Sequence, residues 1–281
     1  MHSRLIHNGR LIEARRARLA AVSPAAFYGC GVFTTLAVYG GRPLLWPQHW
    51  ARLADHADRA GVDRSEFAEA EVKELLARLI KANRVRDGRA RLTLAARAGR
   101  GAWKLAREDE RKTDLIIVTG DARAVRDEGL AITVSPYRLN TLSPLAGLKS
   151  LNYLERIIAW EEARARHFDD AVMLNERGEV VSATMANIFW VKEGRAHTPA
   201  LSTGALAGTT RGAIIALAKE LGVPVIEGVY KLAELGGADE IFLTSAGFGV
   251  SLATSFDYHR YTIPAGSLAL RLREAFRQLT L

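Results

Sequence analysis

The segment "GLKSLNYLE" (Gly147–Glu155) contains the residue with the clearest potential for covalent chemistry, Lys149. Lysine is scarce in this chain, with 8 among 39 basic residues. A lysine amine becomes a nucleophile near neutral pH when it is partly desolvated, and it can then form a Schiff base. A lysine at a loop-to-helix junction is more commonly a solvated surface group. Lys149 is therefore a candidate Schiff-base lysine only in combination with the motifs that accompany it.

A second motif, "LAGTTR" (Leu206–Arg211), is a glycine-containing turn that runs into a predicted helix. Free backbone N–H groups and the helix dipole make such a helix start a phosphate site. The hydroxyl groups of Thr209 and Thr210 can add two donors. The same threonines can instead cap the helix, and this alternative stays open on the sequence alone.

Two further polar residues stand inside otherwise apolar segments. In "QHWARL", Arg52 lies one helical turn after His49, where its guanidinium can bind a phosphate group. Taken alone, Arg52 is an ordinary surface arginine. In "SATMANIFWV" (Ser182–Val191), Asn187 can satisfy backbone groups at a strand bend, which is a structural role.

Seven segments carry a family resemblance in their order along the chain: "YGCGVFTT", "QHWARL", "GLKSLNYLE", "GEVVSATMANIFWV", "HTPAL", "LAGTTR" and "DEIFLTSA". They resemble the signature blocks of class IV aminotransferases that use pyridoxal 5′-phosphate (PLP). That group includes branched-chain and D-amino-acid aminotransferases and 4-amino-4-deoxychorismate lyase. The resemblance spans nearly the whole chain. It implies the α+β architecture called fold type IV, with two α/β domains, PLP in the cleft between them, and usually a homodimer.

Position by position, the resemblance implies that Lys149 holds PLP as a Schiff base and that Arg52 binds its phosphate group. Leu206 matches a residue that lies against the cofactor ring, and Tyr153 is similar to a tyrosine that some members place near the PLP hydroxyl. No metal ligand is predicted. The full set of implied cofactor-binding residues is Arg52, Lys149, Tyr153, Ser182, Leu206, Thr209, Thr210, Thr244 and Ser245.

The chain departs from the family pattern at Ser182. The family usually has a glutamate five positions before the strand asparagine, where it bonds the pyridine nitrogen and keeps it protonated. Five positions before Asn187 this chain has Ser182. Glu179 lies three residues earlier and, in an extended strand, points to the opposite face. A neutral hydroxyl cannot stabilise a pyridinium as a carboxylate does, so the departure handicaps transamination.

Within the family, "GVFTT" (Gly31–Thr35), "GRG" (Gly99–Gly101) and "LAGLKSLNYLE" look most like the lyase branch. That branch eliminates pyruvate from 4-amino-4-deoxychorismate and gives 4-aminobenzoate for folate synthesis. The substrate amine would displace Lys149, which would then abstract the α-proton as general base. Lys149 or a bound water could protonate the leaving enolpyruvyl group. The candidate substrate contacts, three of them arginines suited to carboxylates, are Thr34, Arg97, Arg100 and Arg138.

Three other functions remain open at this level. One is a transaminase for branched-chain or D-amino acids, and another is a PLP-binding paralogue that lost catalysis when Ser182 arose. The third is a basic RNA-binding protein. Cys30 replaces the acidic residue that is common at its place in the loop, which weakens substrate assignment by loop similarity.

Apolar spacing predicts the elements that must position these motifs. One helix runs from His49 to a stop at Gly61, and a capping box at Asp63 and Glu66 starts the next. Later helices are expected at about 151–166, 210–221 and 267–278. Strands are expected at about 90–97, 114–119, 131–137, 170–174, 179–183, 187–192, 223–229 and 240–244.

Runs of strands with helices between them suggest an α+β protein with two lobes. The polar stretch "GDARAVRDEG" is the expected linker, at residues 120–129. It would separate a small N-terminal α/β domain (1–119) from a larger C-terminal PLP-binding domain (130–281).

The composition narrows the range of possible binding partners and cellular locations. Of the 281 residues, 48% are hydrophobic and 25% charged, which is ordinary for a globular protein. The net charge of +8 is spread among acidic residues without a nucleic-acid-binding motif, so it fits a small amino-acid-like anionic substrate better than nucleic acid. The N-terminus lacks an apolar signal segment, and no apolar run is long enough for a membrane span. Cys30 is the one cysteine, which fits a reducing, cytoplasmic location.

Overall fold

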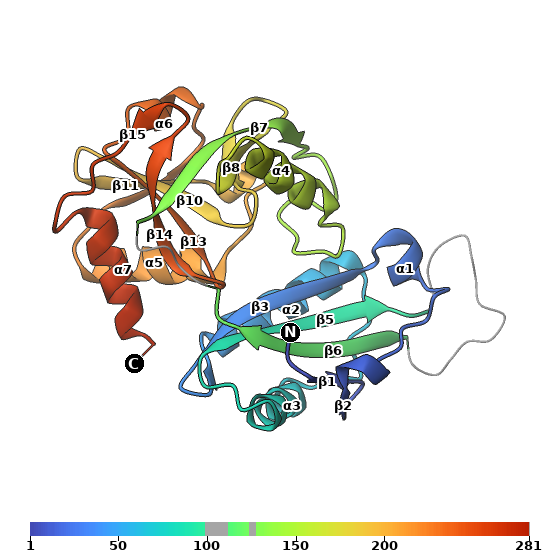
Figure 1. Ribbon diagram of the computed structural model, residues 1–281. Coiled ribbons are helices and arrows are strands. Elements are labelled where there is room, and N and C mark those ends of the chain that lie inside the picture. The colour runs from blue at the N-terminus through green and yellow to red at the C-terminus, as the bar shows by residue number, and fades with distance from the viewer. Residues whose placement is uncertain (99–111, 124–127, 281) are drawn as a thin grey trace. The chain divides into compact units, whose positions relative to one another are not determined.

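Apolar and β-branched stretches alternate with amphipathic helices along the first third of the chain, and they form a six-stranded antiparallel sheet with helices packed on it (Figure 1). The computed structural model describes residues 1–98, 112–123 and 128–280. The chain divides into two compact units. The first is Met1–Arg123 with Leu148–Tyr153, and the second is Ala124–Gly147 with Leu154–Leu281.

The sheet of the first unit has the strand order β2-β1-β6-β5-β3-β4. One face carries the apolar residues that form the core with α2 and α3, including Leu36, Leu92 and Ile117. The elements are β1 (Arg4–His7), β2 (Arg10–Glu13), the 3₁₀ helix η1 (Ala14–Arg16), α1 (Pro24–Tyr28), β3 (Gly31–Tyr39), β4 (Arg42–Pro43), α2 (Trp46–Ala60), α3 (Glu69–Ala82), β5 (Gly88–Ala96) and β6 (Thr113–Asp121).

Helix α2 confirms the expected stop at Gly61, which adopts a left-handed conformation with φ of 62° and closes the last turn. The predicted capping box is wrong. Helix α3 begins at Glu69, and Asp63 instead accepts a hydrogen bond of 3.0 Å from the N–H of Ser65 within a turn. Asp63 forms this local turn because a short carboxylate readily bonds the backbone two residues on.

Residues Leu148–Tyr153 belong to the first unit, although they follow the boundary expected at 120–129. An isolated bridge joins Ser150 to Val32, and the N–H of Phe33 donates to the carbonyl of Lys149 at 2.9 Å. Lys149 is therefore fixed along the edge of β3, five residues before α4 begins. Part of the expected linker, residues 124–127, lies outside the described residues.

The second unit contains a nine-stranded mixed sheet whose main path is β12-β11-β10-β13-β14-β7-β8-β9, with β15 paired to β14. Its elements are β7 (Leu130–Leu139), α4 (Leu154–Ala165), β8 (Asp170–Asn175), β9 (Val180–Ala183), β10 (Asn187–Lys192), β11 (Arg195–Pro199), η2 (Leu201–Thr203), α5 (Thr209–Glu220), β12 (Val225–Gly228), α6 (Ala233–Gly236), β13 (Glu240–Ser245), β14 (Gly249–Phe256), β15 (His259–Arg260) and α7 (Leu268–Gln278).

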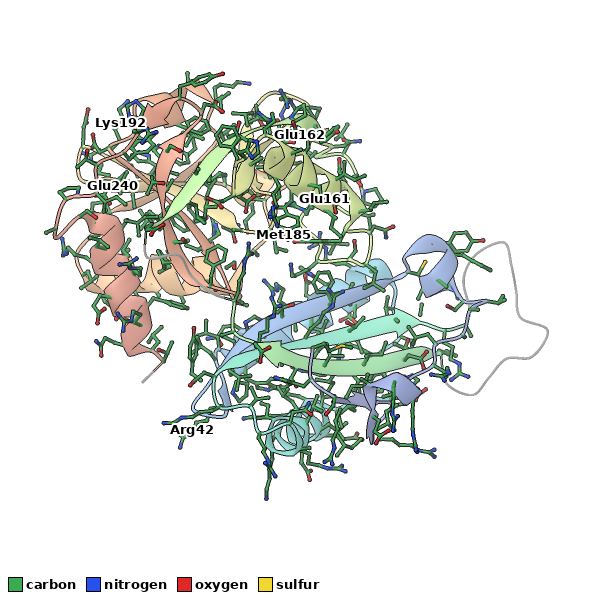
Figure 2. The ribbon with its side chains drawn as sticks, in the orientation of Figure 1. Arg42, Glu161, Glu162, Met185, Lys192 and Glu240 are labelled. Carbon is green, nitrogen blue, oxygen red and sulfur yellow. The ribbon has the colours of Figure 1, made fainter. Side chains whose placement is uncertain are left out.

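The sequence failed to predict the central strand β14. Its first five residues are all buried, so the alternation of polar and apolar residues that marks a half-exposed strand is missing. The last helix, α7, starts where expected because two groups satisfy its first N–H groups. Ser267 accepts from Leu270, and Glu240, which is labelled in Figure 2, accepts from Leu268 and Ala269 at 2.9 Å each. Among the described residues, no helix is long and apolar enough to cross a membrane.

Candidate active site

Lys149 is held by its backbone and its side chain in the first unit. Its N–H donates to Nδ1 of His56 at 3.0 Å, and its Nζ lies 3.2 Å from the hydroxyl oxygen of Tyr153. The Nζ also lies 4.6 Å from the ring centroid of Phe33 and 4.7 Å from that of Tyr153. The two rings meet edge to face at 5.3 Å. The amine is therefore partly shielded from water by aromatic surface, as a nucleophilic lysine requires.

Three residues at helical spacing on α2 face this region: His49, Arg52 and His56. Arg52 Nη2 donates to Thr34 Oγ1 at 2.9 Å, and Thr34 Oγ1 lies 2.7 Å from His49 Nδ1. Since a guanidinium has only donors, the Thr34 hydroxyl accepts from Arg52. Burial lowers the pKa of Arg52 to about 10, with Tyr153 opposing the shift. Arg52 remains a cation at neutral pH.

The two histidines of α2 are neutral in the folded protein. Burial lowers the pKa of His49 to about 3, and the nearby charges of Arg52 and Lys149 add to this shift. Burial followed by the charge of Arg52 lowers the pKa of His56 to about 4. A neutral His56 can accept the Lys149 N–H at Nδ1, and a protonated one cannot.

We expect this neutrality to make the protein less stable as the pH falls. Unfolded histidines titrate near 6.5, so below that value the unfolded chain binds protons that His49 and His56 refuse when folded. Stability is fully present above pH 6.5 and declines toward pH 4. Between pH 7 and pH 5 each histidine should lower the free energy of unfolding by about 2 kcal/mol, measured by urea unfolding.

The variant His49→Asn/His56→Asn should lose most of this dependence of the unfolding free energy on pH. The control His259→Asn, at an exposed site, should keep it. An unchanged slope in the double variant contradicts the assignment.

The second unit contains a separate set of polar groups around the start of α5. Gly208 is the N-cap residue, which has no side chain of its own to cap the helix, and no acidic residue stands in its first turn. Both threonines are buried. The helix start keeps the character of an anion site.

Asn187 supports this turn from the neighbouring strand. Its Nδ2 donates to the carbonyl of Leu206 at 2.9 Å, which confirms the structural role expected for it. A Cβ atom added at Gly208 would collide with Asn187 Oδ1, so only glycine fits there unless the Asn187 side chain shifts. Thr244 pairs with Asn187 across β10 and β13, and the next residue, Ser245, accepts from the N–H of Gly247 at 3.1 Å. These contacts bring three sequence-predicted segments together within one unit.

Ser182 lies on β9 and is buried, with 3% of its surface exposed. Arg156, in the first turn of α4, donates through Nη1 to Ser182 Oγ at 3.2 Å. The same nitrogen lies 3.1 Å from the carbonyl oxygen of Thr184 and 3.4 Å from that of Ala183. A guanidinium thus lies beside the serine that replaces the glutamate expected from the sequence resemblance.

Comparison with known proteins identifies the family of this chain. The sequence profile described as "Amino-transferase class IV" matches residues 31–256, which is most of the chain. The chain belongs to the class IV aminotransferases. It is 30% identical to the aminodeoxychorismate lyase of Bacillus subtilis, over 96% of this chain and 92% of the relative.

Solved structures confirm the fold type IV architecture of this class IV aminotransferase. The branched-chain amino acid aminotransferase of Escherichia coli superposes with a TM-score of 0.91 at 27% identity, covering 100% of this chain and 95% of that one. The 4-amino-4-deoxychorismate lyase of Pseudomonas aeruginosa superposes with a TM-score of 0.84 at 29% identity, covering 98% of each chain. The protein is a PLP-dependent enzyme of mixed α and β structure.

The residues present fit PLP. Thr244 Oγ1 is buried and has no hydrogen-bond partner among the described residues, which leaves a donor for a ligand. The helix start at Gly208 has N–H groups of the kind that bind phosphate, and Lys149 has an amine of the kind that forms a Schiff base with an aldehyde. Each observation matches one part of the cofactor.

The four candidate substrate contacts of this class IV enzyme differ in their surroundings. The hydroxyl of Thr34 is buried and bonds Arg52 and His49. Arg97 Nη1 lies 3.7 Å from a carboxylate oxygen of Asp114. Arg100 lies outside the described residues.

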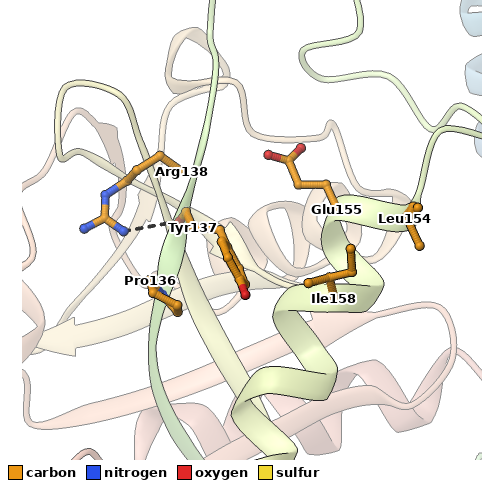
Figure 3. Close-up of a pocket in the computed structure, with 6 residues that line it drawn as sticks. All are labelled: Pro136, Tyr137, Arg138, Leu154, Glu155 and Ile158. Atoms are coloured by element: carbon orange, nitrogen blue, oxygen red, sulfur yellow. Dashed lines mark hydrogen bonds between the residues drawn. The ribbon is translucent and has the colours of Figure 1, made fainter.

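Arg138 lines a cavity of about 590 Å³ together with Pro136, Tyr137, Leu154, Glu155 and Ile158. Its Nη1 donates to the backbone carbonyls of Ser135 at 2.9 Å and Tyr137 at 3.2 Å. Figure 3 shows its guanidinium directed away from Glu155. Local hydrogen bonds to the backbone thus hold Arg138, and no sequence pattern indicates them.

Sequence reasoning missed four residues of the site: Phe33, His56, Arg91 and Arg156. The guanidinium carbon of Arg91 lies 3.6 Å from the centroid of the Phe33 ring and fixes that ring beside Lys149. Only His56 left a usable signal, since it follows His49 by seven residues and so shares its face of the helix.

Proposed function

We propose that the protein is a PLP-dependent lyase that eliminates pyruvate from 4-amino-4-deoxychorismate and releases 4-aminobenzoate. The observation that supports this choice is the hydroxyl of Ser182, bound by Arg156, where the family usually has a glutamate. Bound PLP supplies an electron sink for negative charge at the carbon that carries the substrate amine. Elimination needs that charge only until the leaving group departs, whereas transamination requires further proton transfer that a protonated ring favours.

In this proposal Lys149 attaches the cofactor covalently and its Nζ then removes the substrate proton. Tyr153 OH orients that amine, and His56 holds the backbone beneath it. Arg52 provides a cation for the phosphate group, positioned by Thr34. The remaining cofactor contacts that we propose are Leu206, Thr209, Thr210, Thr244 and Ser245.

The substrate proposed here is a small amino-acid-like anion, and the excess of basic residues attracts such molecules. We propose Arg97, Arg100 and Arg138 as carboxylate partners, of which Arg97 and Arg138 would exchange their present contacts for substrate. We propose that the enzyme is a homodimer and that it is located in the cytoplasm. Its single cysteine fits the reducing conditions of that compartment.

The second candidate is a transaminase for branched-chain or D-amino acids. Its support is the TM-score of 0.91 to the branched-chain enzyme of Escherichia coli, higher than that to the lyase of Pseudomonas aeruginosa. One assay separates the two. The purified protein with added PLP should release 4-aminobenzoate and pyruvate from 4-amino-4-deoxychorismate faster than it aminates keto acids. Keto-acid amination without 4-aminobenzoate contradicts the lyase and supports the transaminase.

A further inference from the structure

The contact between Arg156 and Ser182 determines which way the serine hydroxyl can donate. Arg156 offers only N–H donors, so Ser182 Oγ must accept in their 3.2 Å contact. The hydroxyl proton of Ser182 is then free to point to another acceptor. A pyridine nitrogen with a free lone pair is such an acceptor, whereas a protonated pyridinium is a donor and needs an anion.

The guanidinium is held in place by the backbone as well. The carbonyl oxygens of Ala183 and Thr184 accept from the same Nη1 atom, at 3.4 and 3.1 Å. Thr184 is fixed in turn by Asp170, whose Oδ1 accepts from its N–H at 2.9 Å and its hydroxyl at 2.5 Å. The backbone of the turn between β9 and β10, residues 184–186, thus helps to hold the positive charge beside Ser182.

The turn at residues 184–186 also leads to the proposed phosphate turn. It ends at Asn187, whose amide bonds the carbonyl of Leu206 and leaves room only for glycine at position 208. Ser182 and the start of α5 therefore belong to one connected set of residues within the second unit. A cofactor whose phosphate binds at the start of α5 would have the turn at residues 184–186 as a neighbour.

We propose that Arg156 acts through Ser182 as a positioning residue that keeps the pyridine nitrogen of PLP unprotonated. The inference rests on the proposed function, since it assumes that PLP binds with its ring nitrogen at Ser182. Two effects operate in the same direction. The Ser182 hydroxyl donates to the nitrogen lone pair, and the nearby guanidinium charge opposes a second positive charge on the ring. Asp170, at the start of β8, is an acidic group that contacts this turn, and its Oδ1 accepts from the N–H and hydroxyl of Thr184 and from the N–H of Ala171.

The test is nitrogen NMR of the holoenzyme loaded with PLP that is ¹⁵N-labelled in the ring, recorded across a pH series. The natural protein should show an unprotonated ring nitrogen at pH 7. Arg156→Gln keeps an N–H donor but removes the charge, and it should raise the pH of half-protonation by at least about one unit, a tenfold gain in proton affinity. Arg156→Lys should restore the low midpoint. Arg164→Gln, on an exposed residue of the same helix, should leave the midpoint unchanged.

The outcomes separate this inference from the proposed function. A protonated nitrogen in the natural protein at pH 7 contradicts the inference, and this measurement needs no variant to fold. Equal midpoints in the natural protein and Arg156→Gln contradict it as well, while the lyase assay stands independently. If the natural protein retains no PLP at all, both the inference and the proposed function fail. An unprotonated nitrogen in a protein that only transaminates upholds the inference and removes the lyase.

Discussion

Replacing Lys149 by alanine is expected to abolish covalent retention of PLP and to slow release of 4-aminobenzoate by at least about 10²- to 10⁴-fold, the range of general acid–base catalysis. The Lys149 amine is the one described lysine Nζ that lies beside both Phe33 and Tyr153, at 4.6 and 4.7 Å from their rings. Its backbone is fixed to β3 and to His56. A neighbouring lysine cannot take over this position.

The measurement is borohydride reduction of the PLP-loaded protein followed by peptide mass analysis. The natural protein should carry the reduced pyridoxyl group on the peptide that contains Lys149. Lys219→Ala removes an exposed lysine of α5 and provides the matched control, which should label and turn over normally. Labelling of another lysine in the natural protein, or full labelling of Lys149→Ala, contradicts the assignment.

The second large effect concerns the balance between elimination and transamination. Ser182→Glu should raise the rate of half-transamination relative to pyruvate elimination by about tenfold or more, because one pKa unit at the ring nitrogen is worth about 1.4 kcal/mol. Arg156 lies 3.2 Å from Ser182 Oγ, so a glutamate at this position also pairs with the guanidinium. The double variant Ser182→Glu/Arg156→Gln removes that competition, and it should shift the balance further.

Stopped-flow spectroscopy with 4-amino-4-deoxychorismate and with L- and D-amino acids measures both reactions. Ser182→Ala is the matched control, because it removes the hydroxyl without adding a negative charge, and it should not favour transamination. The rate of half-transamination relative to elimination is expected to rise from the natural protein to Ser182→Glu, and again to the double variant. Brisk formation of pyridoxamine phosphate by the natural protein, without 4-aminobenzoate, overturns the lyase proposal.

The sequence predicted elements whose signals are local. Helix α2 and its stop at Gly61 follow from apolar spacing and a glycine that tolerates a positive φ. The glycine turn before α5 and the serine at position 182 are also legible in the sequence, the latter by counting back from Asn187. The prediction of a capping box was wrong because the Asp63 carboxylate can bond either a helix start or a local turn. In the structure it accepts from the N–H of Ser65 in a turn.

The tertiary structure alone decided which distant residues meet. His56 reaches the N–H of Lys149 across 93 positions, and Arg156 reaches Ser182 across 26. Such contacts depend on strand register and on how α2 and α4 pack, and neither leaves a periodic pattern in the chain. Arg138 was a plausible carboxylate partner from its residue type, but its own strand supplies carbonyls at 2.9 and 3.2 Å. The sequence determined which chemical groups are available, and packing determined the charge beside each of them, because desolvation and Coulomb interactions act through space.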